Sequence, residues 1–280
     1  MPKEKILKTI ALSIVGVFAV IGALFTFVFA GMQFGLFNVR GSAAERDQFF
    51  NHQSMRDTVC DDTRTLCEWN QTPEWATIRE GLIKDSSVIA DVSEKTGVSK
   101  RMIASVVIPE QVRFFTSERE IFKRYFEPLK ILGSLSQFSL GVSGIKQETA
   151  NTIEQNATDS TSPFYPGSKI KELIVYQNGV DHDTELYNRL TDPKNHYYSY
   201  LYTALYIKEV ETEWKQAGYD IAQAPGVVAT LFNIGFQASH PNPKPQVGGS
   251  EITTGGKIYA FGELGALFYS SDELTDVFPK

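Results

Sequence analysis

Hydrophobic and polar residues alternate with a helical period along much of the chain. Between residues 73 and 97, apolar side chains recur every three or four positions, at Trp75, Ile78 and Leu82. This spacing gathers them on one face of a helix. Similar spacing returns further along the chain, so the pattern predicts a mainly helical domain, which we place at residues 81–280.

The most apolar of these helical segments begins after Ser99, a residue suited to cap a helix. The apolar residues between Met102 and Val107 fall at helical spacing, which predicts a helix that buries one face. Glu110 follows near the far end of that face. Apolar surroundings favour the protonated form of a carboxyl group, which a general acid needs near neutral pH. The alternative is a solvated glutamate in the last helical turn.

Residues 9–39 contain no charged side chain and are mostly apolar. A helix needs about 20 apolar residues to cross a bilayer core, so this run is long enough. A cleavable signal peptide would have a shorter apolar region and a clear small-residue cleavage site, so we expect an uncleaved anchor. The lysines within residues 1–8 predict a cytoplasmic tail, with the chain beyond the anchor on the other side of the membrane.

The formal net charge of −6 at pH 7 is unevenly distributed. Residues 1–40 carry +3, which leaves −9 on the remaining residues. A surface that binds nucleic acid is basic, so this charge excludes nucleic acid as a partner of the domain. An acidic domain is not attracted electrostatically to an anionic polymer, so binding to one would depend on local contacts.

Cys60 and Cys67 are the only cysteines, and they lie in a polar stretch at residues 40–80 that we interpret as an extracytoplasmic stalk. In an oxidising compartment a loop this short is readily closed by a disulfide, which stabilises by roughly 2–3 kcal/mol. The alternative is two unpaired thiols. Two cysteines alone cannot fill the four positions of a zinc site, so we assign no metal.

From His240 the chain is rich in proline and glycine, which predicts a long loop. Two short strands around residues 253–261, turning at Gly255 and Gly256, would fit within it. We therefore expect a small irregular or β element near the C-terminus of a mainly α domain.

Three separate pieces of the sequence carry a family resemblance. They are the apolar helix with Glu110, a glycine-rich stretch with Gly141 and Gly144 that ends in Thr-Ala, and the tetrapeptide Phe232-Asn233-Ile-Gly. In this order they resemble the lysozyme-like lytic transglycosylases of the soluble-lytic-transglycosylase type, which cut the glycan strands of bacterial peptidoglycan. In that family a Glu closes a helix, a G-L-M-Q-x-M-P-x-T-A loop follows, and Y-N-A-G comes later.

The resemblance implies a lysozyme-like helical fold and a membrane-anchored enzyme that cleaves the MurNAc–GlcNAc bond. Glu110 would act as general acid and then as base, while Gly141, Gly144, Phe232 and Asn233 would bind the glycan strand. One carboxylate suffices because the substrate's own N-acetyl group can assist at the anomeric carbon, and no cofactor is implied. The implied location is the inner (cytoplasmic) membrane, crossed once, with the catalytic domain in the periplasm.

The chain departs from the family pattern at several positions. Pro109 precedes the acid, Gln111 stands where Ser is usual, and Phe232 lacks the hydroxyl of the usual Tyr. An ungapped match of the loop puts Gly144 where Gln is usual, whereas a gapped match would align Gln147 with that Gln. The departures favour an alternative function, a catalytically degenerate peptidoglycan-binding or scaffold protein.

A different pair of short motifs is typical of the serine enzymes that recognise penicillin. Residues 143–146 match S-x-x-K and residues 95–97 match K-T-G. Their order along the chain is the reverse of the order in that class, and S-D-N is missing between them. We therefore prefer the transglycosylase resemblance.

Overall fold

The computed structural model describes residues 66–116, 139–177 and 179–280, together with scattered positions between residues 12 and 26. As the sequence pattern predicted, these residues are mainly helical. The α-helices are α3 (Pro73–Lys84), α4 (Ser86–Thr96), α5 (Lys100–Thr116), α7 (Gln147–Thr158), α8 (His182–Thr191), α9 (Tyr197–Gln216), α10 (Pro225–Ile234) and α11 (Phe261–Ser270). Short 3-10 helices lie at η1 (Trp69–Gln71), η4 (Ile170–Ile174) and η5 (Phe236–Ala238). Two antiparallel hairpins pair β1 (Ser139–Leu140) with β2 (Ile145–Lys146), and β3 (Glu251–Thr254) with β4 (Lys257–Ala260).

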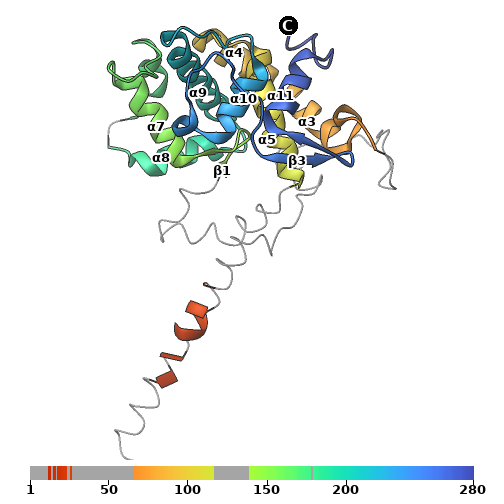
Figure 1. Cartoon of the computed structure of the whole chain (residues 1–280). Helices are drawn as coiled ribbons and strands as arrows, with labels where there is room; N and C mark the ends of the chain where they lie inside the picture. Colours follow the sequence, from red (N-terminus) through yellow and green to blue (C-terminus); the bar gives the residue numbers. More distant parts are fainter. Residues whose placement is uncertain are drawn as a thin grey trace, which may run out of the picture.

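Helix α5 is buried on all sides rather than along one face. All of residues 101–109 are buried, and α3, α4, α9, α10 and α11 pack around them. In Figure 1, α5 lies within the helical body next to α10, α11 and α3. The expectation of a single apolar face is therefore wrong for this helix, which forms the centre of the core.

The helix also continues beyond Glu110 to Thr116, with Pro109 inside it. Proline has no N–H to donate to the carbonyl of Ser105, one turn earlier. Gly265 of α11 packs over this carbonyl, since a Cβ atom at Gly265 would lie 2.7 Å from the Ser105 oxygen. Glu110 is thus held within a helix by neighbouring elements, and the prediction that it closes the helix is corrected.

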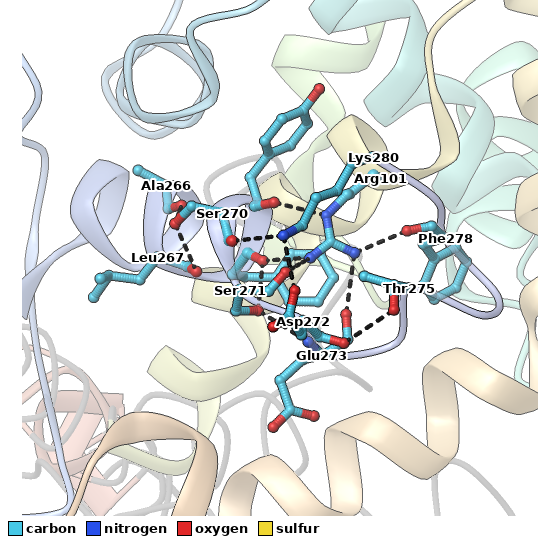
Figure 2. A network of polar contacts seen from close by, with 12 residues as sticks. Arg101, Ala266, Leu267, Ser270, Ser271, Asp272, Glu273, Thr275, Phe278 and Lys280 are labelled. Carbon is cyan, nitrogen blue, oxygen red and sulfur yellow. Dashed lines mark hydrogen bonds and ion pairs between the residues drawn. The ribbon is translucent and has the colours of Figure 1, made fainter.

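One buried charged residue joins the start of α5 to the C-terminal segment (Figure 2). Arg101 is 0% exposed, and its five N–H groups all donate to backbone carbonyls at 2.6–3.0 Å. The acceptors are the carbonyl oxygens of Phe268, Tyr269, Ser271, Glu273 and Phe278. The guanidinium also lies 4.7 Å from the centre of the Phe268 ring. Arg101 therefore closes the end of α11 and fixes the residues after it against α5.

The described part of the predicted stalk packs into the same core. The rings of Trp69 and Trp75 meet edge to face with centroids 4.8 Å apart, and both approach the ring of Phe268. The predicted boundary between residues 80 and 81 falls inside α3, which is buried on both sides of it through Ile78 and Leu82. The folded body therefore begins by residue 66.

Most of the predicted anchor at residues 9–39, like the tail at residues 1–8, lies outside the described residues. The positions described between Leu12 and Thr26 are helical, and their large apolar side chains are exposed. Among the described residues, no helix combines the length and the apolar character needed to cross a bilayer.

The turn of the C-terminal hairpin follows from its two glycines. Gly255 and Gly256 both have positive φ values, 58° and 75°, as a two-residue hairpin turn requires. The carbonyl of Gly255 accepts a hydrogen bond from the backbone N–H of Cys67 at 2.9 Å. The predicted small β element is therefore present, and it packs on the segment that enters the folded body.

A second buried ionisable residue, Glu209, connects α9 to α7. Its side chain is 0% exposed, one oxygen accepts a hydrogen bond from Asn156 at 2.9 Å, and the other oxygen has no partner in the described part of the chain. Burial raises the pKa of Glu209 to about 9, although the bond from Asn156 acts in the opposite direction. The carboxyl group is therefore protonated in the folded protein at neutral pH.

This protonation predicts a loss of stability with rising pH. Between the unfolded pKa of 4.5 and the folded value of about 9, the folded state holds one proton more. Glu209 therefore makes its full contribution to the free energy of unfolding below pH 4.5. Between pH 4.5 and about 9 this contribution falls by up to about 1.4 kcal/mol per pH unit. We expect Glu209→Gln to flatten this decline in urea unfolding at pH 5–8. The exposed Glu172→Gln is the control, and an equal slope in both variants would contradict the prediction.

Candidate active site

Glu110 lies in the second half of α5 and is paired with a residue of the same helix. Nη2 of Arg113, one turn later, donates to Oε1 of Glu110 at 2.6 Å. The Glu110 side chain is 11% exposed and that of Arg113 is 28% exposed. The Glu110 side chain therefore lies at the edge of the core, and a small part of it is exposed to solvent.

The glycine-rich stretch forms the turn of the β1–β2 hairpin, and this turn packs on Glu110. Gly141 and Gly144 both have a φ of 64°, the left-handed conformation that glycine tolerates best. A Cβ atom at Gly144 would lie 2.2 Å from Oε1 of Glu110 and 2.5 Å from its Cδ. Glycine at 144 is thus what allows the Glu110 carboxylate to occupy its observed place.

Gly141 has a different close neighbour. A Cβ atom there would lie 2.2 Å from the carbonyl oxygen of Leu190 and 2.4 Å from Oγ of Ser199. Gly141 therefore lets the turn pack on the end of α8 and the start of α9, while Gly144 packs on α5.

Buried polar side chains fix the turn from both sides. Nε2 of Gln111 donates to the carbonyl of Val142, and Oγ of Ser143 donates to the carbonyl of Ser199 at 2.9 Å. Gln111 is 1% exposed and Ser143 is 0% exposed. Gln111, which the sequence analysis marked only as a departure, is thus an anchor of the turn. The sequence feature that could have indicated this role is a polar residue directly after Glu110 in an otherwise apolar helix.

Phe232 and Asn233 lie in the last turn of α10 and make local contacts. Oδ1 of Asn233 accepts a hydrogen bond from the backbone N–H of Ser250 at 2.7 Å. The Phe232 ring packs edge to face on Tyr206, with centroids 5.1 Å apart. Among the described contacts, none joins either residue to Glu110. The structure thus brings Glu110 and Gly144 together, and it gives Asn233 a role in holding the 248–250 loop.

Cys67 is buried and disulfide-bonded. Cys60 lies outside the described residues, so the Cys60–Cys67 pairing itself stays a prediction.

A further polar cluster lies where α7, α8 and α9 meet. The carboxylate of Glu154 accepts hydrogen bonds from the hydroxyls of Tyr176 and Tyr202, and its other oxygen is 2.6 Å from Nε2 of His182. Burial has the largest single effect on the pKa of His182 and lowers it, but the hydrogen bonds and negative charges of Glu154 and Asp183 together outweigh burial, so the net shift is upward. His182, which the sequence places between two aspartates, thus links two helices. The described residues contain no cluster of three or more potential metal ligands.

Comparisons of the chain with protein families, with curated proteins and with solved structures find no match.

Proposed function

We propose that this protein is a membrane-anchored lytic transglycosylase with a lysozyme-like domain that cleaves the MurNAc–GlcNAc bond of peptidoglycan. The observation that carries the proposal is the contact between Glu110 and Gly144. These residues come from two of the three pieces that resemble the family, they are separated by a long stretch of sequence, and a Cβ atom at Gly144 would touch the carboxylate.

In the proposed mechanism Glu110 is the only acid and base. Its carboxyl proton goes to the glycosidic oxygen as the bond from C1 to that oxygen breaks, and the N-acetyl group of the same sugar stabilises C1. The resulting carboxylate then accepts the proton of the O6 hydroxyl while O6 attacks C1. The product carries a 1,6-anhydro ring, and water is not consumed, so a second carboxylate is unnecessary.

The glycine-rich turn would contribute through its backbone. Gly141 and Gly144 let the turn pack directly on Leu190, Ser199 and Glu110, so its part in the proposed site is to position the acid. Gln111 and Ser143 support this role, because their hydrogen bonds hold the turn in one position against α5.

A degenerate, glycan-binding protein is the second candidate, and a specific contact favours it. General acid catalysis needs a protonated carboxyl, whereas the 2.6 Å contact of Glu110 with Arg113 is one that a carboxylate makes. The hydrogen bond that engages Asn233 with Ser250 and the packing of Phe232 on Tyr206 also fit this candidate.

The anchor and the location belong to the proposal as well. The uncharged run at residues 9–39, the lysines before it and the disulfide-bonded Cys67 support an extracytoplasmic domain attached to the inner membrane by one helix.

A digest of purified cell walls tests the proposed reaction. The full chain in detergent is incubated with peptidoglycan, and the soluble products are separated and weighed by mass spectrometry. We expect muropeptides with 1,6-anhydro-MurNAc ends. Reducing ends would indicate a hydrolase, and the absence of released products would favour the binding protein.

A further inference from the structure

We propose that His182 is a pH-dependent positioning residue, which holds α8 against α7 and thereby keeps the glycine-rich turn in place on Glu110. It acts on Glu110 only through α8 and the turn. This role concerns where the turn lies, so it does not depend on the reaction proposed above.

The first observation is the bond between the two helices. His182 is the first residue of α8, and its Nε2 lies 2.6 Å from Oε2 of Glu154 in α7. The other oxygen of Glu154 accepts hydrogen bonds from the hydroxyls of Tyr176 and Tyr202, so the carboxylate is held from two sides. The His182 side chain is 45% exposed. The histidine can therefore exchange its proton with solvent while the fold stays closed.

Tyr176 connects this bond to the other end of α8. Its ring contacts the His182 ring, with centroids 4.5 Å apart, and the Arg189 guanidinium, whose carbon lies 4.1 Å from the ring centre. Arg189 is buried and also donates to the carbonyl of Val175 at 2.9 Å. The first and the last turn of α8 therefore pack on the same aromatic ring.

The last turn of α8 meets the glycine-rich turn through a backbone atom. A Cβ atom at Gly141 would lie 2.2 Å from the carbonyl oxygen of Leu190, the residue after Arg189. Gly144, at the other end of the same turn, is equally close to Oε1 of Glu110. Because neither glycine has a side chain that could adjust, a displacement of the end of α8 is transmitted to the turn that packs on Glu110.

The surroundings of His182 favour its charged form. The ionisable groups that face it from its own helix and from the elements packed against it are carboxyls and phenols, with one cation across the Tyr176 ring. They are Asp181 and Asp183 at the start of α8, Glu154 of α7, Tyr176 after η4, Tyr202 of α9, and the cation of Arg189.

The direction of the pH dependence follows from these groups. Burial has the largest single effect on the pKa of His182 and lowers it, but Glu154 and Asp183 together raise the pKa above its ordinary value of 6.5. The extra stability of the charged bond is therefore fully present below pH 6.5, and it is lost as the pH rises through the higher pKa of the folded state.

Hydrogen exchange of the full chain in detergent, measured by mass spectrometry at pH 5.5 and pH 8.5, tests this role. Rates are corrected for the chemical effect of pH and expressed relative to residues 251–260, so that effects shared by the whole fold cancel. We expect residues 139–146 of the parent to exchange roughly 2- to 5-fold faster at pH 8.5, as an exposed ion pair allows. His182→Gln, whose amide can still bond to Glu154 but carries no charge, should show equal relative rates.

The matched control is His240→Gln, which removes another exposed histidine, in the loop after η5, and should keep the pH dependence of the parent. The role of His182 is overturned if the parent shows no pH dependence in residues 139–146. It is also overturned if His182→Gln keeps this dependence, which would assign it to another group such as the buried His196. Tryptophan fluorescence shows that each variant is folded before it is compared.

Discussion

Replacing Arg101 by methionine is expected to lower the free energy of unfolding by roughly 3–5 kcal/mol. The substitution keeps most of the aliphatic stem but removes all five N–H donors from five carbonyls (Figure 2). The carbonyl of Phe268 still accepts from the N–H and the hydroxyl of Ser271. A buried polar group without a partner costs about 1–3 kcal/mol, and partial relaxation of the segment after α11 limits the sum. Arg101 is 0% exposed, so water cannot replace the guanidinium without local opening.

Urea unfolding of the full chain in detergent, followed by tryptophan fluorescence, measures this effect. The three tryptophans, Trp69, Trp75 and Trp214, are all buried, so their emission reports on the core. Arg79→Met is the matched control, because its side chain is 47% exposed and should change stability by less than about 1 kcal/mol. Equal unfolding midpoints for the two variants would show that the hydrogen bonds from Arg101 to the carbonyls of α11 and of the residues after it do not stabilise the fold.

The second large effect concerns catalysis. Glu110→Gln should reduce the release of anhydro-muropeptides by about 10²–10⁴-fold, the usual contribution of a general acid and base. The amide has nearly the shape of the carboxyl group and its oxygen can still accept from Arg113, so the variant should fold and bind glycan normally. It cannot, however, give a proton to the glycosidic oxygen.

The comparison variant is Glu148→Gln in the first turn of α7. Its carboxylate is exposed and follows the glycine-rich turn, so this variant should keep most of the activity. Release of anhydro products by Glu110→Gln at the parent rate would assign the chemistry to another residue. Products with reducing ends would require a second carboxylate.

The sequence predicted helical segments and turns well, because these depend on spacing and on local backbone needs. The positive φ values of Gly144, Gly255 and Gly256 lie where turns were expected. The sequence was less informative about which other elements pack around each segment. Helix α5 was expected to bury one face because of the spacing of its apolar residues, yet the polar Arg101 and Ser105 are fully buried as well. Their partners lie in α11 and the residues after it, which spacing within one segment cannot reveal.

The candidate site shows the same limit. The family resemblance assigned Glu110 and Gly144 to one site, as the acid and as a residue that binds the glycan strand. It did not imply their direct contact, the anchoring role of Gln111 or the ion pair with Arg113. Gln111 and Arg113 both belong to the part of α5 beyond Pro109, where the sequence analysis had expected the helix to end. A proline inside a helix costs stability in isolation, but the packing of α11 over Ser105 offsets this cost.

The position of Arg101 also constrains the order in which the chain can fold during synthesis. Its carbonyl partners follow it by 167 to 177 residues. A ribosome adds roughly 5–20 residues per second, so these partners arrive roughly 10–30 s after the arginine. Until then the guanidinium must remain in water, which keeps the first turn of the central helix outside the core. Nascent chains therefore expose the part of α5 that α11 covers throughout this interval, and they need protection from aggregation until α11 and the residues after it have been made.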